Sequence, residues 1–281
     1  MRLPKRMRVA VVGHVEWIEF ARVERVPKAG EIVHASETWE AAAGGGAVAA
    51  VQLARLADEC TFFTALGDDA LGHAAKQQLE AFGVDVEVAW RPEEQRRGFV
   101  YLDADGERTI TVMGARCGPR AGDPLPWSEL EGADAVYLTA GDPDAVSAAR
   151  EARRLVATVR AIESLASAHV EIDALVASAR DEGERYRPGD LDPPPGLVAR
   201  TDGAAGGTLT AADGSSTPWE PAPLPGPAVD AYGAGDCFAA GFTFALADGR
   251  TSRDAVAFGA CCGAACMTGR GPYEGQLRTP E

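Results

Sequence analysis

The stretch that most constrains this chain is residues 227–242, where a glycine-rich turn leads into an apolar helix. Gly233 and Gly235 permit backbone conformations that other residues resist. The first N–H groups of the predicted helix, together with its dipole, form a natural anion site. Asp236 stands beside that site. It is predicted either to accept a proton from an attacking hydroxyl or, as the simpler alternative, to cap the helix.

This stretch resembles the signature of the ribokinase-type (PfkB) carbohydrate kinase family, D-T-x-G-A-G-D followed by an apolar helix. The chain reads D-A-Y-G-A-G-D and so has Ala231 in place of the threonine. The resemblance implies that the backbone of Gly233, Ala234 and Gly235 forms an anion hole. It also implies that Asp236 is the catalytic base.

The composition limits the classes of partner. The chain has 281 residues, of which 46% are hydrophobic, and a formal net charge of −15. This negative charge argues against nucleic acid or an anionic membrane as a partner. No uncharged run reaches the ~20 residues that a membrane helix needs, and the N-terminal apolar piece is too short for a signal peptide. We therefore expect a cytoplasmic protein with no membrane partner.

Two glutamates follow the first predicted strand. An apolar run that ends in Gly13 is typical of a buried parallel strand. Ligands of open α/β sheets bind beyond the carboxyl ends of such strands. Glu16 and Glu19 are therefore candidates to accept hydrogen bonds from substrate hydroxyls, with an exposed strand edge as the alternative. The resemblance places an acceptor-binding aspartate close to Ile18, between these two glutamates.

The resemblance also places the other acceptor-site candidates. Gly44 and Gly45 open an Ala-rich helix where the family has G-G-x-x-x-N, and their backbone is expected to approach the acceptor. Val48 stands at the asparagine position and removes a hydrogen-bonding group, which predicts that the acceptor is not simple ribose. Arg116 replaces the asparagine of a G-A-N element. Its guanidinium is predicted to bind an anionic group of substrate or nucleotide, unless it is an ordinary surface arginine.

Two segments are expected to form a small β lid over the site. The first covers about residues 14–38, and residues 32–39 have strand composition. The second, about residues 97–113, alternates like a β-hairpin around a turn at Asp103 and Gly106. Relatives often pair through their lids, so the resemblance also suggests a homodimer.

Further along the chain, two elements resemble the family's nucleotide site. The N-x-x-E element, which helps to place Mg²⁺ and phosphate through water, corresponds to the stretch from Ser178 to Asp181. Asp181 and Glu182 are the predicted metal residues and Ser178 is a predicted nucleotide contact, with a solvated charged surface as the alternative. The family's T-x-G-x-x-G element, which lies along the nucleotide, corresponds to Thr201, Gly203 and Gly206.

Two structural predictions concern helices. Asp69, in the family-like stretch L-G-D-D-A-L-G, is expected to cap a helix that runs to about Phe82. Residues 142–160 are expected to form one helix, because their apolar residues recur with helical periodicity.

The resemblance spans about residues 8–273 in family order. It implies an α/β fold, a ribokinase-like three-layer α/β/α sandwich with a mostly parallel central sheet, formed by residues 1–281 as a single kinase domain with the lid segments inserted in it. The implied function is transfer of the γ-phosphoryl group of ATP to a hydroxyl of a sugar or a related small polar metabolite. ATP and Mg²⁺ are the expected cofactors, and a monovalent cation is a further candidate. Two alternatives stay open: a nucleoside kinase of the same fold, and a non-catalytic relative that binds a metabolite.

Overall fold

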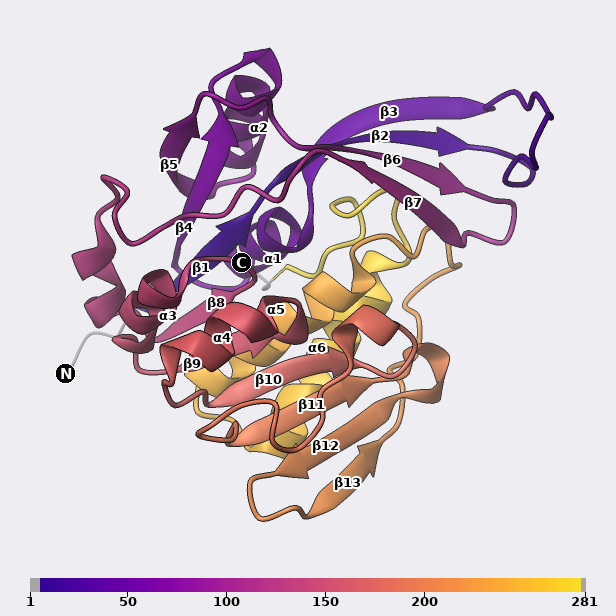
Figure 1. The fold of residues 1–281 in the computed structure, drawn as a ribbon. Helices are drawn as coiled ribbons and strands as arrows, with labels where there is room; N and C mark the ends of the chain where they lie inside the picture. The colour runs from indigo at the N-terminus through magenta and orange to yellow at the C-terminus, as the bar shows by residue number, and fades with distance from the viewer. Residues whose placement is uncertain (1–5, 279–281) are drawn as a thin grey trace.

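The structure, a computed structural model, describes residues 6–278. The two ends of the predicted domain, residues 1–5 and 279–281, lie outside the described residues. Within residues 6–278 the strands form a nine-stranded sheet and a separate four-stranded sheet. Figure 1 shows the larger sheet in the middle of the molecule and the smaller one projecting from it.

The larger sheet is mostly parallel, as predicted. Its order is β13-β12-β11-β10-β9-β8-β1-β4-β5, and only the pairings of β12 with its two neighbours are antiparallel. β1 therefore lies in the interior of the sheet, and the chain adds strands on one side of it and then on the other. The strands are β1 (Arg8–His14), β4 (Glu59–Gly67), β5 (Asp85–Arg91), β8 (Ala135–Leu138), β9 (Leu155–Thr158), β10 (Ala174–Ser178), β11 (Leu197–Thr201), β12 (Gly207–Ala211) and β13 (Ser216–Trp219).

Helices cover both faces of this sheet, which confirms the three-layer sandwich. Alternate residues of β1 belong to two separate hydrophobic clusters, Val9 and Val11 to one and Ala10 and Val12 to the other. Such alternation is expected of a strand that is buried on both faces. The first cluster contains α1 (Gly45–Ala54), α2 (Ala70–Ala81), α5 (Ala234–Ala247) and α6 (Ser252–Cys266), and the second contains α3 (Pro143–Arg150) and α4 (Ile162–Ala168).

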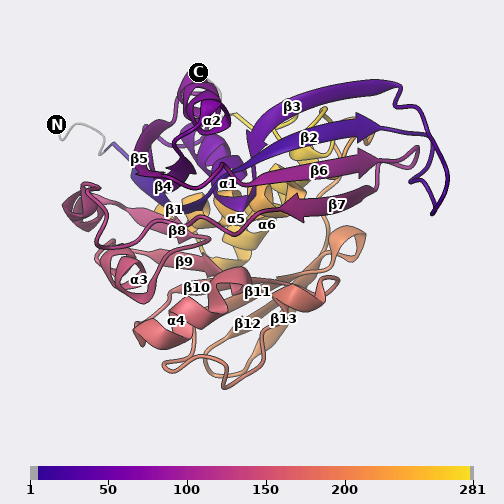
Figure 2. The same ribbon diagram turned by 45° about the horizontal axis from the view of Figure 1, so that its top comes forward.

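The smaller sheet has the strand order β3-β2-β6-β7 and extends away from the helices, as Figure 2 shows. The predicted segments contain β2, β6 and β7, but residues 32–36 form no strand, and β3 begins at Glu37 and continues beyond the predicted segment to Ala43. One face rests on the larger body, where the ring of Phe20 meets Tyr232 edge to face at 5.0 Å. The strands are β2 (Glu16–Arg22), β3 (Glu37–Ala43), β6 (Arg97–Leu102) and β7 (Arg108–Met113).

Asp69 has the structural role that the sequence predicts. Its side chain caps α2 by accepting a hydrogen bond from the backbone N–H of Gly72 at 2.8 Å, and it also accepts one from the N–H of Gln95 at 2.8 Å. A Cβ atom at Gly72 would lie only 1.9 Å from the carbonyl oxygen of Gly67. The glycines of this motif therefore allow the strand end and the helix start to pack closely.

The prediction of one helix over residues 142–160 is wrong. α3 ends at Arg150, and β9 follows over Leu155–Thr158. β9 is buried throughout and pairs in parallel with both β8 and β10. Its four residues are too few to show a period of their own, so pairing with distant strands decides their conformation. A further helix, α4, follows it. No helix in the described part of the chain is both long and apolar enough to cross a membrane.

Candidate active site

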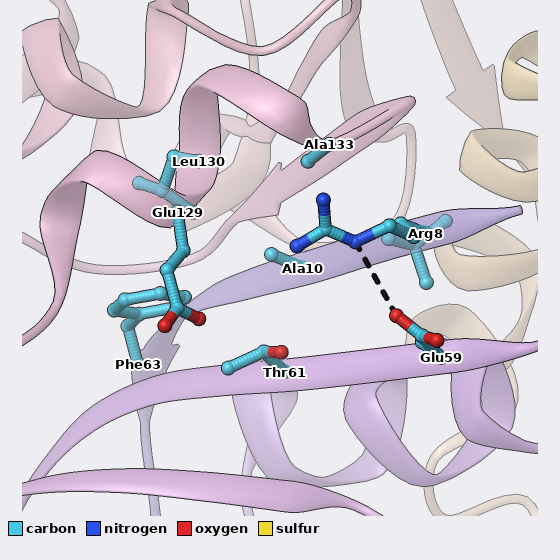
Figure 3. Close-up of a pocket in the computed structure, with 9 residues that line it drawn as sticks. Arg8, Ala10, Glu59, Thr61, Phe63, Glu129, Leu130 and Ala133 are labelled. Atoms are coloured by element: carbon cyan, nitrogen blue, oxygen red, sulfur yellow. Dashed lines mark ion pairs between the residues drawn. The ribbon is translucent and has the colours of Figure 1, made fainter.

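The predicted site residues gather at the carboxyl ends of the parallel strands. His14 ends β1, Ser178 ends β10 and Thr201 ends β11. This edge of an open α/β sheet is where ligands bind. At the opposite ends of the strands the recess around Arg8 and Glu59 has a volume of only about 10 Å³, room for about one water molecule. Figure 3 shows that the Arg8–Glu59 ion pair lies across it.

Two helix starts meet at the site. α5 begins at Ala234 after Gly233, whose φ is +83°, and α1 begins at Gly45 after Gly44, whose φ is +87°. L-residues rarely adopt such φ values. A Cβ atom on Gly45 would lie 3.0 Å from Oδ1 of Asp236. The predicted acceptor glycines and the predicted base are therefore adjacent, and the glycines leave the space beside the carboxylate free.

Asp236 does not cap α5. The N-cap residue is Gly233, which makes no side-chain cap hydrogen bond, and Asp236 is the third residue of the helix. Its side chain is only partly exposed. Burial raises the pKa of Asp236 to about 7, and the negative charge of Glu184 adds to the rise. The helix dipole by itself would favour an ionised carboxylate at neutral pH, but burial outweighs that effect here.

On the acceptor side, β1 and β2 bring a histidine and a glutamate together. Glu16 is 8% exposed, and its Oε1 lies 3.0 Å from Nε of Arg96 and 3.9 Å from Nε2 of His14. Nδ1 of His14 is buried and has no hydrogen-bond partner among residues 6–278. Burial lowers the pKa of His14 well below its usual value, and Arg116 and Arg96 lower it further. The imidazole is therefore neutral and can donate or accept a hydrogen bond.

Three arginines surround this pair. Nη1 of Arg116 donates to the backbone oxygen of Arg160 at 3.2 Å. Arg96, Arg116 and Arg160 all lower the pKa of Glu16, although burial raises it overall. Sequence analysis identified Arg116 but missed the other two, because only the fold brings the residues before β6 and after β9 to the same place. Arg160 forms ion pairs with two carboxylates of its own, but Arg96 and Arg116 together carry more positive charge than Glu16 neutralises and can bind an anion.

Glu19, the second glutamate considered from the sequence, does not share this environment. Its side chain is 40% exposed, and its Oε1 lies 4.0 Å from Nη1 of Arg97. Successive residues of a strand alternate between faces. Glu19 therefore lies on the more exposed face of β2, although β2 pairs with β3 and β6 and so has no free edge.

The predicted nucleotide residues line the ends of β10 and β11. Oγ of Ser178 accepts from the backbone N–H of Asp181 at 3.2 Å, and Oγ1 of Thr201 donates to the carbonyl of Ala177 at 3.3 Å. Gly206 has a φ of +80°, and a Cβ there would lie 2.1 Å from the carbonyl oxygen of Trp219. These contacts hold the turns in shape. Because these side chains are used within the turns, the backbone groups of the turns are the ones that remain free to contact a nucleotide.

The predicted metal carboxylates separate in the structure. Asp181 forms an ion pair with Arg160, and so does Glu184. Glu182 instead is 86% exposed and lies 3.6 Å from Arg185. Glu184, which sequence analysis missed, acts on Asp236 electrostatically. It lies three residues after Asp181, so considering every carboxylate close to Asp181 in the sequence would have identified it.

No group of three or more His, Cys, Asp or Glu side chains that could hold a metal ion occurs in the described residues. Mg²⁺ in kinase sites is commonly bound through one or two carboxylates, water and the substrate phosphates, without an all-protein cage. Asp181 and Glu184 fit that kind of site, because they stand together at the nucleotide end and Arg160 is their shared cation.

A comparison with known families gives one match over nearly the whole chain. The model of the pfkB family of carbohydrate kinases matches residues 6–182 and 196–279. The match includes the glycine turn before α5, both strands that end at the nucleotide side, and the smaller sheet.

Individual proteins agree with the family match. The chain is 34% identical to the ATP-dependent ribose-1-phosphate kinase of Halopiger xanaduensis, over 92% of this chain and 91% of that protein. It is 28% identical to the aminoimidazole riboside kinase of Salmonella typhimurium, over 84% and 86%. The structure of Arabidopsis thaliana ribokinase complexed with ribose and ATP superposes with a TM-score of 0.74 at 22% identity, over 97% and 96%. This last likeness concerns the fold.

The raised pKa of Asp236 predicts how stability depends on pH. Between the unfolded pKa near 3.8 and the folded pKa of about 7, the native state holds a proton that the unfolded state has lost. This site therefore makes the protein less stable as pH rises through that window, and the loss levels off above it. Asp236→Asn lacks the effect. We expect the difference in free energy of unfolding in urea, Asp236→Asn minus wild type, to increase from pH 4 to pH 8.

The matched control is the exposed Asp144→Asn, which should run parallel to the wild type over the same pH range. A constant difference between Asp236→Asn and the wild type would show that the folded carboxyl has an ordinary pKa.

Proposed function

Since the chain belongs to the pfkB family of carbohydrate kinases, we propose that it transfers the γ-phosphoryl group of ATP to a hydroxyl of a phosphorylated pentose. That it is an ATP-dependent phosphotransferase with an alcohol acceptor follows from the family and from its kinase relatives. The proposal concerns the acceptor and the residues that act on it. The observation that carries it is the pair of arginines, Arg96 and Arg116, whose charges act on Glu16 and His14.

Asp236 is proposed as the general base. The acceptor oxygen attacks the γ-phosphorus, its proton passes to the Asp236 carboxylate, and the bond from the γ-phosphorus to the bridging oxygen breaks, so that ADP leaves with the electron pair. The first N–H groups of α5, from Ala234 to Asp236, face the transferred group and offset its charge. The glycines at 44 and 45 leave room for the acceptor hydroxyl beside the carboxylate.

Mg²⁺, where bound, would neutralise charge on the nucleotide phosphates. Asp181 and Glu184 are proposed to hold its water ligands, in place of the pair Asp181 and Glu182. Thr201, Gly203 and Gly206 are proposed to border the nucleotide through their backbone, with Ser178 supporting the neighbouring turn.

The phosphorylated acceptor is supported by charge. An acceptor that is uncharged would leave the guanidinium groups of Arg96 and Arg116 facing only Glu16. A phosphate would match them with charge-assisted hydrogen bonds. The relative from Halopiger xanaduensis is named for ribose 1-phosphate, and we propose an acceptor of that class for this chain.

A nucleoside acceptor would require apolar or aromatic side chains that line the acceptor side, and the two candidates there are not free to do so. Trp17 is 8% exposed and donates through Nε1 to Glu40, so it offers no stacking surface. Val48 is fully buried, and its Cγ1 would lie 3.1 Å from a Cβ placed on Gly233. Both side chains therefore pack in the protein and do not line an acceptor pocket.

Asp236→Asn tests the base assignment. Asparagine keeps the size of the side chain but cannot take the proton, so we expect kcat to fall by about 10²–10⁴. Nucleotide binding should persist, because the backbone anion site is unchanged. Turnover within a few-fold of the wild type, measured on folded protein, would refute the assignment.

An acceptor panel tests the substrate class. With ATP and Mg²⁺ we expect ribose 1-phosphate to be phosphorylated far better than ribose or a nucleoside. Arg116→Ala should raise KM for the phosphorylated acceptor by about tenfold or more, from the loss of a charged hydrogen bond worth roughly 1.5–3 kcal/mol, and should leave KM for ATP nearly unchanged. Arg97→Ala, on the outward side of β6, is the matched control. Efficient turnover of ribose would contradict the proposal.

We also propose that two copies pair through the smaller sheet, the proposed lid. All six residues of β7 are exposed, so its edge offers unpaired backbone groups. Light scattering coupled to size-exclusion chromatography should give the mass of a dimer. A monomer mass at micromolar concentration would exclude this assembly.

A further inference from the structure

The hairpin between β6 and β7 touches the turn that leads into α5. The carbonyl oxygen of Gly106 accepts a hydrogen bond from the N–H of Ala231 at 3.4 Å, and Nη1 of Arg108 donates to the carbonyl of Ala231 at 3.2 Å. A Cβ at Gly106 would lie 3.4 Å from the carbonyl oxygen of Val229. The hairpin tip is thus seated on the backbone of residues 229–231, which we call the entry segment.

The entry segment is held from its other side as well. The buried carboxylate of Asp230 accepts from the N–H of Tyr232 at 2.7 Å and from the N–H of Gly271 at 2.9 Å. The Tyr232 hydroxyl is hydrogen-bonded to the backbone of Gly44. Arg108 therefore contributes the lid's part of a clamp that sets the position of the Gly233 turn.

The carbonyl of Ala231 links this clamp to the anion hole. It also accepts a hydrogen bond from the N–H of Ala234, at 3.4 Å. Ala234 is the first residue of α5, and its N–H belongs to the proposed phosphoryl site. The oxygen accepts both hydrogen bonds, and the one from Ala234 is long and therefore weak, so its N–H can turn to the transferred group while Arg108 still holds the carbonyl.

Arg108 also changes the charge around Asp236. Among the groups that favour the ionised carboxylate, Arg108 has the largest effect and Arg160 follows. Glu184 and Glu16 oppose them. Other charged or titratable groups near Asp236 come from strands, turns and helices on every side of it. The turns include η2 (Val159–Ala161) and η3 (Glu182–Glu184). The groups are His14, Glu16, Arg108, Tyr137, Arg160, Glu184, Tyr232, Cys237 and Tyr273.

We propose that Arg108 is a positioning residue for phosphoryl transfer: when the lid is seated, its guanidinium holds the Ala231 carbonyl and adds the positive charge that keeps Asp236 ready to accept a proton. The inference rests on the proposed role of Asp236 as the base. It couples the lid to the chemistry, because the charge reaches the site only with the hairpin in place.

Arg108→Gln removes the charge and keeps a hydrogen-bond donor of similar reach. We expect kcat/KM to fall about tenfold at pH 7 and the acid limb of its pH profile to move up by about half a unit or more. Arg108→Lys keeps the charge and should keep the wild-type limb. Arg25→Gln, which breaks the ion pair with Glu31 in the loop between β2 and β3, is the matched lid control and should behave as the wild type.

Several outcomes would overturn the proposal. An unchanged profile and rate in Arg108→Gln would do so. An equal loss at every pH in both Arg108 variants would also do so, since it indicates a purely structural effect. If Arg108→Gln does not fold, Arg108→Lys must still show the wild-type limb.

A measurement without turnover separates this inference from the base assignment. The pH-dependent gap in unfolding free energy between the wild type and the Asp236→Asn variant reports the ionisation of the carboxyl in the native state. When both proteins also carry Arg108→Gln, we expect this free-energy difference to continue to grow up to a higher pH than it does with Arg108 present. An identical gap would show that Arg108 does not act on Asp236, whereas normal turnover by Asp236→Asn would overturn only the base assignment.

Discussion

The site depends on the close approach of two helix starts that only glycine allows. A Cβ on Gly233 would lie 2.9 Å from Cβ of Pro272, and its φ of +83° already disfavours other residues. Opposite it, Gly45 leaves the space beside the Asp236 carboxylate free. The first turns of α1 and α5, with their N–H donors, therefore lie beside each other at the Asp236 carboxylate. No side chain could provide the same density of donors without filling the space that the substrates need.

The cost of this arrangement is a carboxylate in a partly buried place. Burial and the charge of Glu184 make the Asp236 anion unfavourable, and Arg108 and Arg160, from two different parts of the chain, oppose them. A base with a pKa of about 7 is well matched to neutral pH, since it is a stronger proton acceptor than a solvated aspartate. The stability lost by holding this group in the native state is the kind of cost that functional sites commonly carry.

The chain keeps the family's glycine pattern before α5 and departs from the family on the side where we propose that the acceptor binds. The glycine turn, the start of α5 and the turns after β10 and β11 follow the family pattern. Val48, at the position of the family's asparagine, packs beneath the Gly233 turn, and the residues that replace it as polar contacts are Arg96, Arg116 and His14. In the proposed function, the backbone supplies the groups for phosphoryl transfer, and side chains from separate loops determine which acceptor binds.

Local signals in the sequence determined the elements whose ends carry glycine or a cap: the turn before α5, the Asp69 cap of α2 and the parallel strands that end in glycine or serine. They also determined Asp236 as the candidate base. They did not determine β9, because four buried residues have no period of their own, nor the partners of Asp236. Arg108, Arg160 and Glu184 come from segments far from Asp236 in the chain, so only the tertiary structure decides that their charges act on its carboxyl group. Charge acts through space and not along the chain, which is why the pKa of Asp236 could be obtained only after folding.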